Sequence, residues 1–127
     1  MRRLVWLVNF ALSLTLANAQ ADSVGLATMI IGTPEVETEA GPSALQKGDE
    51  IAAGSRVVTG RGDHVHIRFV DGTLVSVRPN TILSIDLFEG NNDQVESFRL
   101  DLDRGVIRTI SGDGLKSNRE GFRLNTP

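Results

Sequence analysis

His64 and His66 come closest, among the residues of this chain, to a pattern that could do chemistry. They are the two histidines of a 127-residue sequence, and residues at positions i and i+2 point to the same side of a strand. Two imidazoles placed in this way can ligate zinc, with Asp63 or Asp71 as a third ligand. The simpler interpretation is that His66 belongs to the polar side of a β-hairpin, so we expect no metal site here.

Two oxygen-rich stretches raise the question of calcium. Asn91-Asn92-Asp93 forms one of them, and Asp101 with Asp103 forms the other. Their side chains are of the kind that calcium binds, but their spacing matches no calcium loop that we recognise. Solvated turns explain the two stretches better, and we predict neither a metal nor a cofactor.

Carboxylates also recur at Glu35, Glu37 and Glu39, on one face of an expected strand. Paired-carboxylate catalysis needs a cleft, whereas this segment has the charged outer face that suits the solvated edge of a sheet. No serine has a recognisable His/Asp context, and cysteine is absent. We therefore predict no catalytic residue and a protein that is not an enzyme.

Four arginines surround the same region of the sequence: Arg56, Arg61, Arg68 and Arg78. They could form a small basic patch near the hairpin. The interpretation that we prefer is that they occupy scattered outward positions and balance nearby acids.

The hairpin itself is the strongest structural signal. Val65, Ile67 and Phe69 alternate with polar residues, which is the period of a half-buried strand. Asp71-Gly72 then provides a turn, since glycine adopts the left-handed conformation without strain. A three-residue loop with a bulge at Gly72 would keep the apolar residues of the two strands on one face. We predict that Phe69 lies opposite Val75 and that Ile67 lies opposite Val77.

The remainder of the chain consists of short apolar stretches separated by turn residues, with no sustained helical period. Residues 40–43 are expected to form a loop and 111–114 a turn. This pattern predicts an all-β fold, either a small roll or sandwich or a short β-solenoid, of about nine strands. We expect them at 24–31, 35–39, 55–59, 82–88, 95–102, 106–110 and 120–125, with the two hairpin strands between 65 and 79.

The first nineteen residues have the character of a signal peptide. A basic start is followed by an apolar run at 4–16 and by Ala17-Asn18-Ala19, which is a small-x-small cleavage pattern. We predict a signal-peptide helix at 1–19 that is cleaved between Ala19 and Gln20, and a periplasmic domain at 20–127. The run is short for a transmembrane helix. Membrane contact is expected only if this segment stays uncleaved as an anchor.

Charge and aromatic content narrow the choice of partner. Removing the leader leaves 11 basic against 16 acidic residues, a net charge of −5, which argues against nucleic-acid binding. The single tryptophan, Trp6, lies in the leader, and tyrosine is absent. Sugar-binding sites commonly use these two residue types, so a carbohydrate-binding role is disfavoured.

Several elements, read in order, carry a family resemblance. They are Gly48-Asp49, Val57-Val58-Thr59-Gly60, Val65-x-Ile67-x-Phe69-x-Asp71-Gly72-Thr73, Gly105-x-Ile107-Arg108-x-Ile110-Ser111-Gly112 and Phe122-x-Leu124-x-Thr126-Pro127. This ordered set resembles the FecR-type domain, the periplasmic domain of iron-dicitrate sensor-regulators. Nearly all of its glycines fall at expected turns and its apolar residues on inward faces. The resemblance therefore implies that the matched residues, from Gly48 to Pro127, are structural.

The chain also departs from those sensor-regulators. They carry a cytoplasmic helical domain that holds a sigma factor, whereas here the leader runs directly into the domain. Members of the family usually continue past Thr-Pro, so we expect that the domain is truncated at Pro127 or ends one strand early, which would leave a sheet edge exposed.

The resemblance implies a non-enzymatic protein-interaction or signalling module in the cell envelope of a Gram-negative bacterium. Its partners would be envelope proteins, with no role for nucleic acid. Two alternatives stay open, namely a module that binds glycan or peptidoglycan and a remnant of a longer surface protein.

Overall fold

The computed structural model describes residues 23–127, and the expected signal helix and cleavage between Ala19 and Gln20 lie outside this part. Within it the chain is almost entirely β, as predicted. The strands are β1 (Ser23–Ile31), β2 (Glu35–Thr38), β3 (Gly41–Ala44), β4 (Glu50–Ala52), β5 (Arg56–Val58), β6 (His64–Phe69), β7 (Leu74–Val77), β8 (Ile82–Gly90), β9 (Val95–Arg104), β10 (Ile107–Ile110) and β11 (Phe122–Asn125). Two short helical turns, α1 (Asp113–Ser117) and a 3₁₀ turn at Arg119–Gly121, precede β11.

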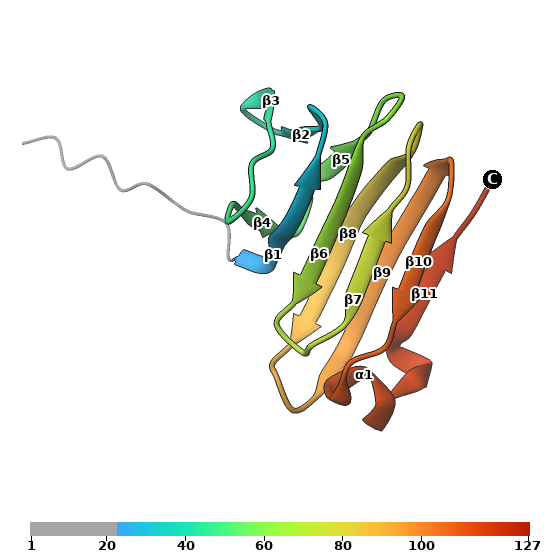
Figure 1. Cartoon of the computed structure of the whole chain (residues 1–127). Coiled ribbons are helices and arrows are strands. Elements are labelled where there is room, and N and C mark those ends of the chain that lie inside the picture. The colour runs from blue at the N-terminus through green and yellow to red at the C-terminus, as the bar shows by residue number, and fades with distance from the viewer. Residues whose placement is uncertain (1–22) are drawn as a thin grey trace, which may run out of the picture.

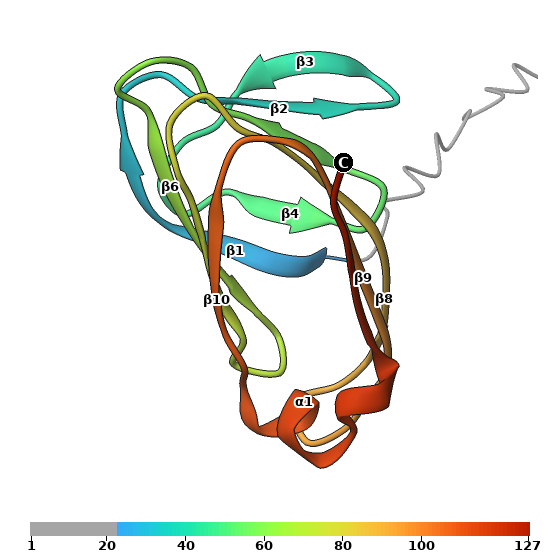
Figure 2. The ribbon, with the colours of Figure 1, turned by 90° about the vertical axis from the view of Figure 1, so that its right-hand side faces the viewer.

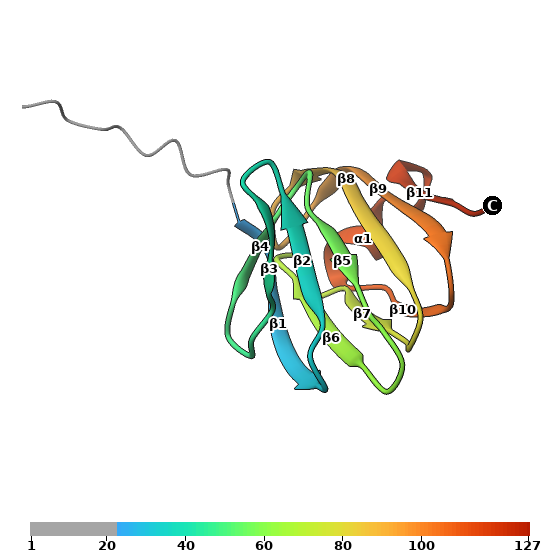
Figure 3. The ribbon, with the colours of Figure 1, turned by 90° about the horizontal axis from the view of Figure 1, so that it is seen from above.

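The strands form two sheets that face each other as a sandwich (Figure 1). The sheet at the front of Figure 1, the front sheet, has the order β10-β7-β6-β1-β4. The back sheet has the order β11-β9-β8-β5-β2-β3. Seen from above, the two sheets lie as two layers, and the chain passes repeatedly from one to the other (Figure 3). Of the three predicted architectures, the structure is the sandwich.

The core lies between the layers and is built around phenylalanine rings. Phe69 of the front sheet lies 4.8 Å from Phe98 and 6.0 Å from Phe88 of the back sheet, measured between ring centroids. Phe122 extends the cluster, 5.4 Å from Phe98. Phe69 and Phe98 are almost fully buried. Inward-facing residues of the predicted alternation, Phe69 among them, thus form the hydrophobic core that holds the two sheets together.

The central hairpin has the predicted loop length but not the predicted pairing. The loop residues are 70–72, one position earlier than expected, and Ile67 pairs with Val75 while Val65 pairs with Val77. The pairing is therefore shifted by two residues. The inward face is unchanged, because a shift of two leaves every side chain on the same side of the sheet.

Hydrogen bonds of the loop explain the shift. The Phe69 amide donates to the Thr73 carbonyl at 2.9 Å, and the Gly72 amide donates to the Phe69 carbonyl at 2.9 Å. The carboxylate of Asp71 accepts hydrogen bonds from both the amide and the hydroxyl of Thr73. Thr73 is thereby held directly before β7, while Gly72 has the predicted positive φ, at 87°.

Four local expectations were wrong. The segment 35–39 is not a sheet edge, because β3 pairs with β2 and forms the edge itself. Residues 40–43 were expected to form a loop but lie largely in β3, and β4 was not expected as a strand, so the described residues contain eleven strands rather than about nine. Both segments are too short to show periodicity, and Pro42 is compatible with a strand only because β3 is at an edge.

The fourth wrong expectation concerns the segment after β10. The turn expected at 111–114 runs into α1 at Asp113. Together with the 3₁₀ turn, α1 carries the chain from the front sheet to the back sheet at the lower end of the sandwich (Figure 2). There β11 joins β9 in parallel. No helix within residues 23–127 is long and apolar enough to cross a membrane.

Candidate interaction surface

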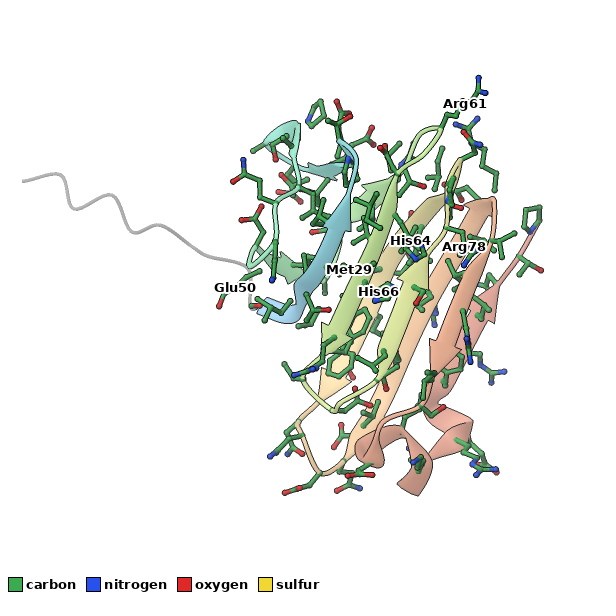
Figure 4. All side chains as sticks on the ribbon, viewed as in Figure 1. Met29, Glu50, Arg61, His64, His66 and Arg78 are labelled. Carbon is green, nitrogen blue, oxygen red and sulfur yellow. The ribbon has the colours of Figure 1, made fainter. Side chains whose placement is uncertain are left out.

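The outer face of the front sheet brings together residues from five strands. Its registers place one side chain from each strand in a single row across the sheet. In strand order this row is Glu50, Leu26, Arg68, Leu74 and Ile110. A second row, one step along the strands, consists of Met29, His66, Ser76 and Arg108. Figure 4 shows His64 and His66 on this face, with Met29 on one side of them and Arg78 on the other.

Exposed apolar side chains gather on this sheet. Seven large hydrophobic residues are exposed within residues 23–127, and six of them lie in the front sheet or in segments directly joined to its strands. Those six are Leu26, Ile31, Val70, Leu74, Val106 and Ile110. Strand register places three of them, Leu26, Leu74 and Ile110, in one row on the outer face, and a group of exposed apolar residues on one face is typical of an interaction site.

The same face carries cations without acidic partners. Arg68, Arg78 and Arg108 are exposed, and none of them forms an ion pair with another described residue. The ion pairs formed among the described residues belong to Arg56, which lies on the back sheet. Its guanidinium is 3.1 Å from Glu37 and 3.8 Å from Asp103. Of the four arginines considered in the sequence, Arg68 and Arg78 thus share a face, and Arg108, which sequence reasoning treated as structural, joins them.

A shallow depression of about 340 Å³ lies on this face between β6, β7 and β10. Its lining comes from β1, β6, β7 and β10, and consists of Thr28, His66, Arg68, Leu74, Val75, Ser76, Arg108 and Ile110. It therefore combines two guanidinium groups, an imidazole and two exposed aliphatic side chains in one place.

His64 and His66 do share a face, as their spacing predicts, and their ring centroids are 4.9 Å apart. Burial lowers the pKa of His64, and the charges of His66 and Arg78 lower it further. Its Nε2 atom is buried without a hydrogen-bond partner among the described residues. Near neutral pH His64 is accordingly an uncharged imidazole.

The carboxylates that were considered as further zinc ligands are engaged in turns. Asp63 accepts hydrogen bonds from the amides of Thr33 and Gly60, both at 2.8 Å. Asp71 is bound to Thr73, as described above. Within residues 23–127 no group of three or more His, Cys, Asp or Glu side chains could hold a metal ion.

The oxygen-rich stretches also have local roles. The Asn91 side chain accepts the amides of Asp93 and Gln94 at 2.9 Å each and so closes the β8–β9 turn. Asp101 and Asp103 lie near Asp86 on the back sheet. Burial raises the pKa of Asp86, and the negative charges of Asp101 and Asp103 add to this effect.

Many residues of the family resemblance fix turns or their contacts. The Thr59 hydroxyl donates to the Arg78 carbonyl at 2.6 Å and accepts the Thr81 amide at 2.9 Å. Gly105 has a φ of 95°, and a Cβ atom there would collide with Thr81. The Gly112 amide donates to the Thr73 hydroxyl at 3.0 Å.

The remaining positions of the resemblance are of two kinds. Gly48 has a φ of 91°, and Asp49 accepts the Gln46 amide at 2.8 Å, so this pair also forms a turn. Arg108, by contrast, projects from the sheet without a described partner, and Thr126 and Pro127 are exposed beyond β11.

Comparison with known proteins adds to this geometry. The family model described as "FecR protein" matches residues 55–127, which is more than half of the sequence. The chain belongs to the FecR family. This is a non-catalytic family, and the Gly48-Asp49 pair lies before the matched range.

Two further comparisons, with curated proteins and with solved structures, add less information about the protein. No curated protein matches the chain significantly. A solved structure titled "Cell surface anchoring domain" is 35% identical, with a TM-score of 0.47, and the alignment covers 49% of this chain and 83% of that one.

Proposed function

We propose that this FecR-family domain is a non-catalytic protein-interaction module of a bacterial cell envelope. The observation that carries the proposal is the outer face of the front sheet, where exposed aliphatic side chains lie among arginines that have no ion-pair partner within residues 23–127. Interfaces combine apolar contact area with arginine in this way, and arginine is enriched there over lysine.

The features of this face are not needed for folding. Inward side chains of the same strands already form the core, and Leu26, Leu74 and Ile110 stay 39%, 38% and 52% exposed. Exposed apolar area of this kind lowers solubility unless a partner covers it. A binding role gives a reason for retaining it.

The proposed location of the protein in the cell envelope rests on the sequence of its first residues. The basic start, the apolar run at 4–16 and the Ala17-Asn18-Ala19 pattern support export. A protein partner is favoured over a glycan, because residues 20–127 contain neither tryptophan nor tyrosine on which a sugar could stack.

Photo-crosslinking in the native host tests the proposal directly. The photoreactive amino acid p-benzoyl-phenylalanine would replace Leu74 on the front sheet in one strain and Asp86 on the back sheet in another. After irradiation, adducts would be isolated and identified by mass spectrometry. We expect a discrete protein adduct from position 74 and none at comparable yield from position 86.

Three outcomes would contradict the proposal. They are equal labelling from the two faces, no protein adduct from position 74 at native expression level, and an adduct that consists of glycan. Cell fractionation of the same strains checks location, because an adduct confined to the cytoplasm would refute the envelope assignment.

A further inference from the structure

We infer that the depression between β6, β7 and β10 binds carboxylates of an acidic protein segment, whose apolar side chains cover Leu74 and Ile110. This inference rests on the proposed function and deepens it, since it assigns a chemistry to the partner. The subsite is defined here by His66, Arg68, Ser76 and Arg108 together with the two aliphatic residues.

Strand register explains how the cations converge. Ser76 of β7 pairs with His66 of β6 on one side and with Arg108 of β10 on the other. Arg68 projects one step along β6, opposite Leu74. The two guanidinium groups therefore reach one depression from strands on either side of β7, and guanidinium groups bind carboxylates with paired, geometrically specific hydrogen bonds.

The positive charge of this subsite is not neutralised from within. Arg68 and Arg108 form no ion pair with any described residue. The acidic residue of the same row, Glu50 of β4, lines a neighbouring depression together with Arg68. It forms no ion pair with Arg68 and does not line the subsite. Two unpaired cations in a concave site are complementary to an anionic ligand.

A second depression of the domain provides the contrast. It measures about 360 Å³ and also contains two arginines, Arg99 and Arg123, on the outer face of the back sheet. It contains Glu96 and Glu120 as well, so its charges are balanced by its own residues. This site serves as the matched control.

The aliphatic residues indicate what kind of anion fits. Leu74 and Ile110 are paired across β7 and β10, and both are exposed next to the arginines. A small inorganic anion would leave them uncovered, whereas a protein segment with acidic and apolar side chains would cover them and bind the cations together. An anionic membrane is disfavoured, since the chain as a whole carries a net charge of −3 and would be repelled by an extended negative surface.

Synthetic peptides provide the first test. The probe is an acetylated and amidated octapeptide that alternates glutamate and leucine, and the controls carry glutamine or lysine in place of glutamate. Affinity for the full domain would be measured by isothermal titration calorimetry. We expect the glutamate peptide to bind at least ten times more tightly than the glutamine peptide, with an affinity that falls as salt is raised.

Variants then localise the site. The double variant Arg68→Gln with Arg108→Gln should lose at least tenfold in affinity for the glutamate peptide. The matched double variant Arg99→Gln with Arg123→Gln removes the same charge from the other depression and should bind as the wild type does. Because all four side chains are exposed, both variants should keep the circular-dichroism spectrum of the wild type.

Several results would overturn the inference. Equal affinity for the glutamate and glutamine peptides would do so, as would an unchanged affinity in the Arg68/Arg108 variant. Tighter binding to phosphatidylglycerol vesicles or to polygalacturonate than to the glutamate peptide would instead assign the face to a lipid surface or an acidic glycan, against our inference.

The inference and the proposed function can fail separately. If photo-crosslinking from position 74 captures a protein and the Arg68/Arg108 variant leaves that adduct unchanged, the face binds protein but not through carboxylates. If position 74 captures no protein, the proposed function itself is wrong.

Discussion

The outer faces of the two sheets differ in how their charged residues are arranged. On the back sheet, acids and bases neighbour one another, and Arg56 is paired with both Glu37 and Asp103. On the front sheet, the arginines stand among aliphatic side chains and have no ion-pair partner within residues 23–127. This difference between the two faces is the basis on which we propose that the front face binds a partner.

Both faces depend on one core, so the largest expected effect comes from breaking that core. Phe69→Ala should lower the free energy of unfolding by about 3–5 kcal/mol, because the ring is fully buried against Phe88 and Phe98. Urea denaturation followed by circular dichroism measures the change. A loss below about 1 kcal/mol would show that the two sheets do not share this core.

The next effect concerns the loop that sets the register of the front face. Gly72→Val should destabilise the domain by about 1–3 kcal/mol, because φ at this position is 87° and β-branched residues are strained there. The matched control is Val70→Ala in the same loop, where the side chain is 45% exposed and the change should be small. Equal melting temperatures for the wild type and Gly72→Val would refute the loop geometry.

How much of this front face could be predicted from the sequence depends on the range of the interactions. The alternation at 65–69 identified the hairpin and its inward face, because a period of two is a local property. The pairing partners were displaced by two, because the Asp71–Thr73 hydrogen bonds that fix them leave no periodic signal. The position of Arg68 and Arg108 on one face could not be predicted from the sequence, since it depends on the strand order β6-β7-β10.

The same reasoning applies to elements that were missed. β3 exists because its Gly41-Pro42-Ser43 stretch pairs with β2, and composition alone favours a loop there. The carboxylates of Asp63 and Asp71 were considered as metal ligands, but their roles as acceptors of turn amides depend on contacts such as that with Thr33, thirty residues away.

Arginine substitutions sharpen the comparison between the faces. Arg56→Gln on the back sheet should cost about 0.2–1 kcal/mol, which is the usual range for a surface ion pair. Arg68→Gln on the front sheet should change stability by less than about 0.5 kcal/mol, because no described acid is paired with it. Parallel urea titrations measure the free energy of unfolding of both variants. A larger loss of stability for Arg68→Gln than for Arg56→Gln would mean that the charge of Arg68 stabilises the fold.

The back face also contains a charge that works against stability. Burial and the neighbouring Asp101 raise the pKa of Asp86, so ionising this carboxyl costs folding free energy. The cost is absent below the unfolded pKa of 3.8 and grows as pH rises through the raised folded value. Asp86→Asn should therefore be slightly more stable than the wild type at pH 7, by an amount that solvent screening of this exposed side chain keeps small, with no advantage at pH 3. An advantage that persists at pH 3 would contradict the electrostatic explanation.

The front face should respond to pH in the opposite direction. Burial, His66 and Arg78 lower the pKa of His64 below its usual 6.5, so the folded state resists protonation of this ring. Its contribution to stability is complete above pH 6.5 and is lost as pH falls from there through the lowered folded value. His64→Gln should flatten this part of the stability profile between pH 7.5 and 5 when melting temperatures are compared with the wild type, whereas Asp86→Asn should leave it unchanged. The ring of His66, which lines the proposed subsite, lies 4.9 Å from the ring of His64. A carboxylate bound there would favour the charged form of His64 and raise its pKa, so peptide binding should also take up protons in this range. Calorimetric titration in two buffers of different ionisation enthalpy measures that uptake. If no protons are taken up, the bound carboxylate does not affect the pKa of His64.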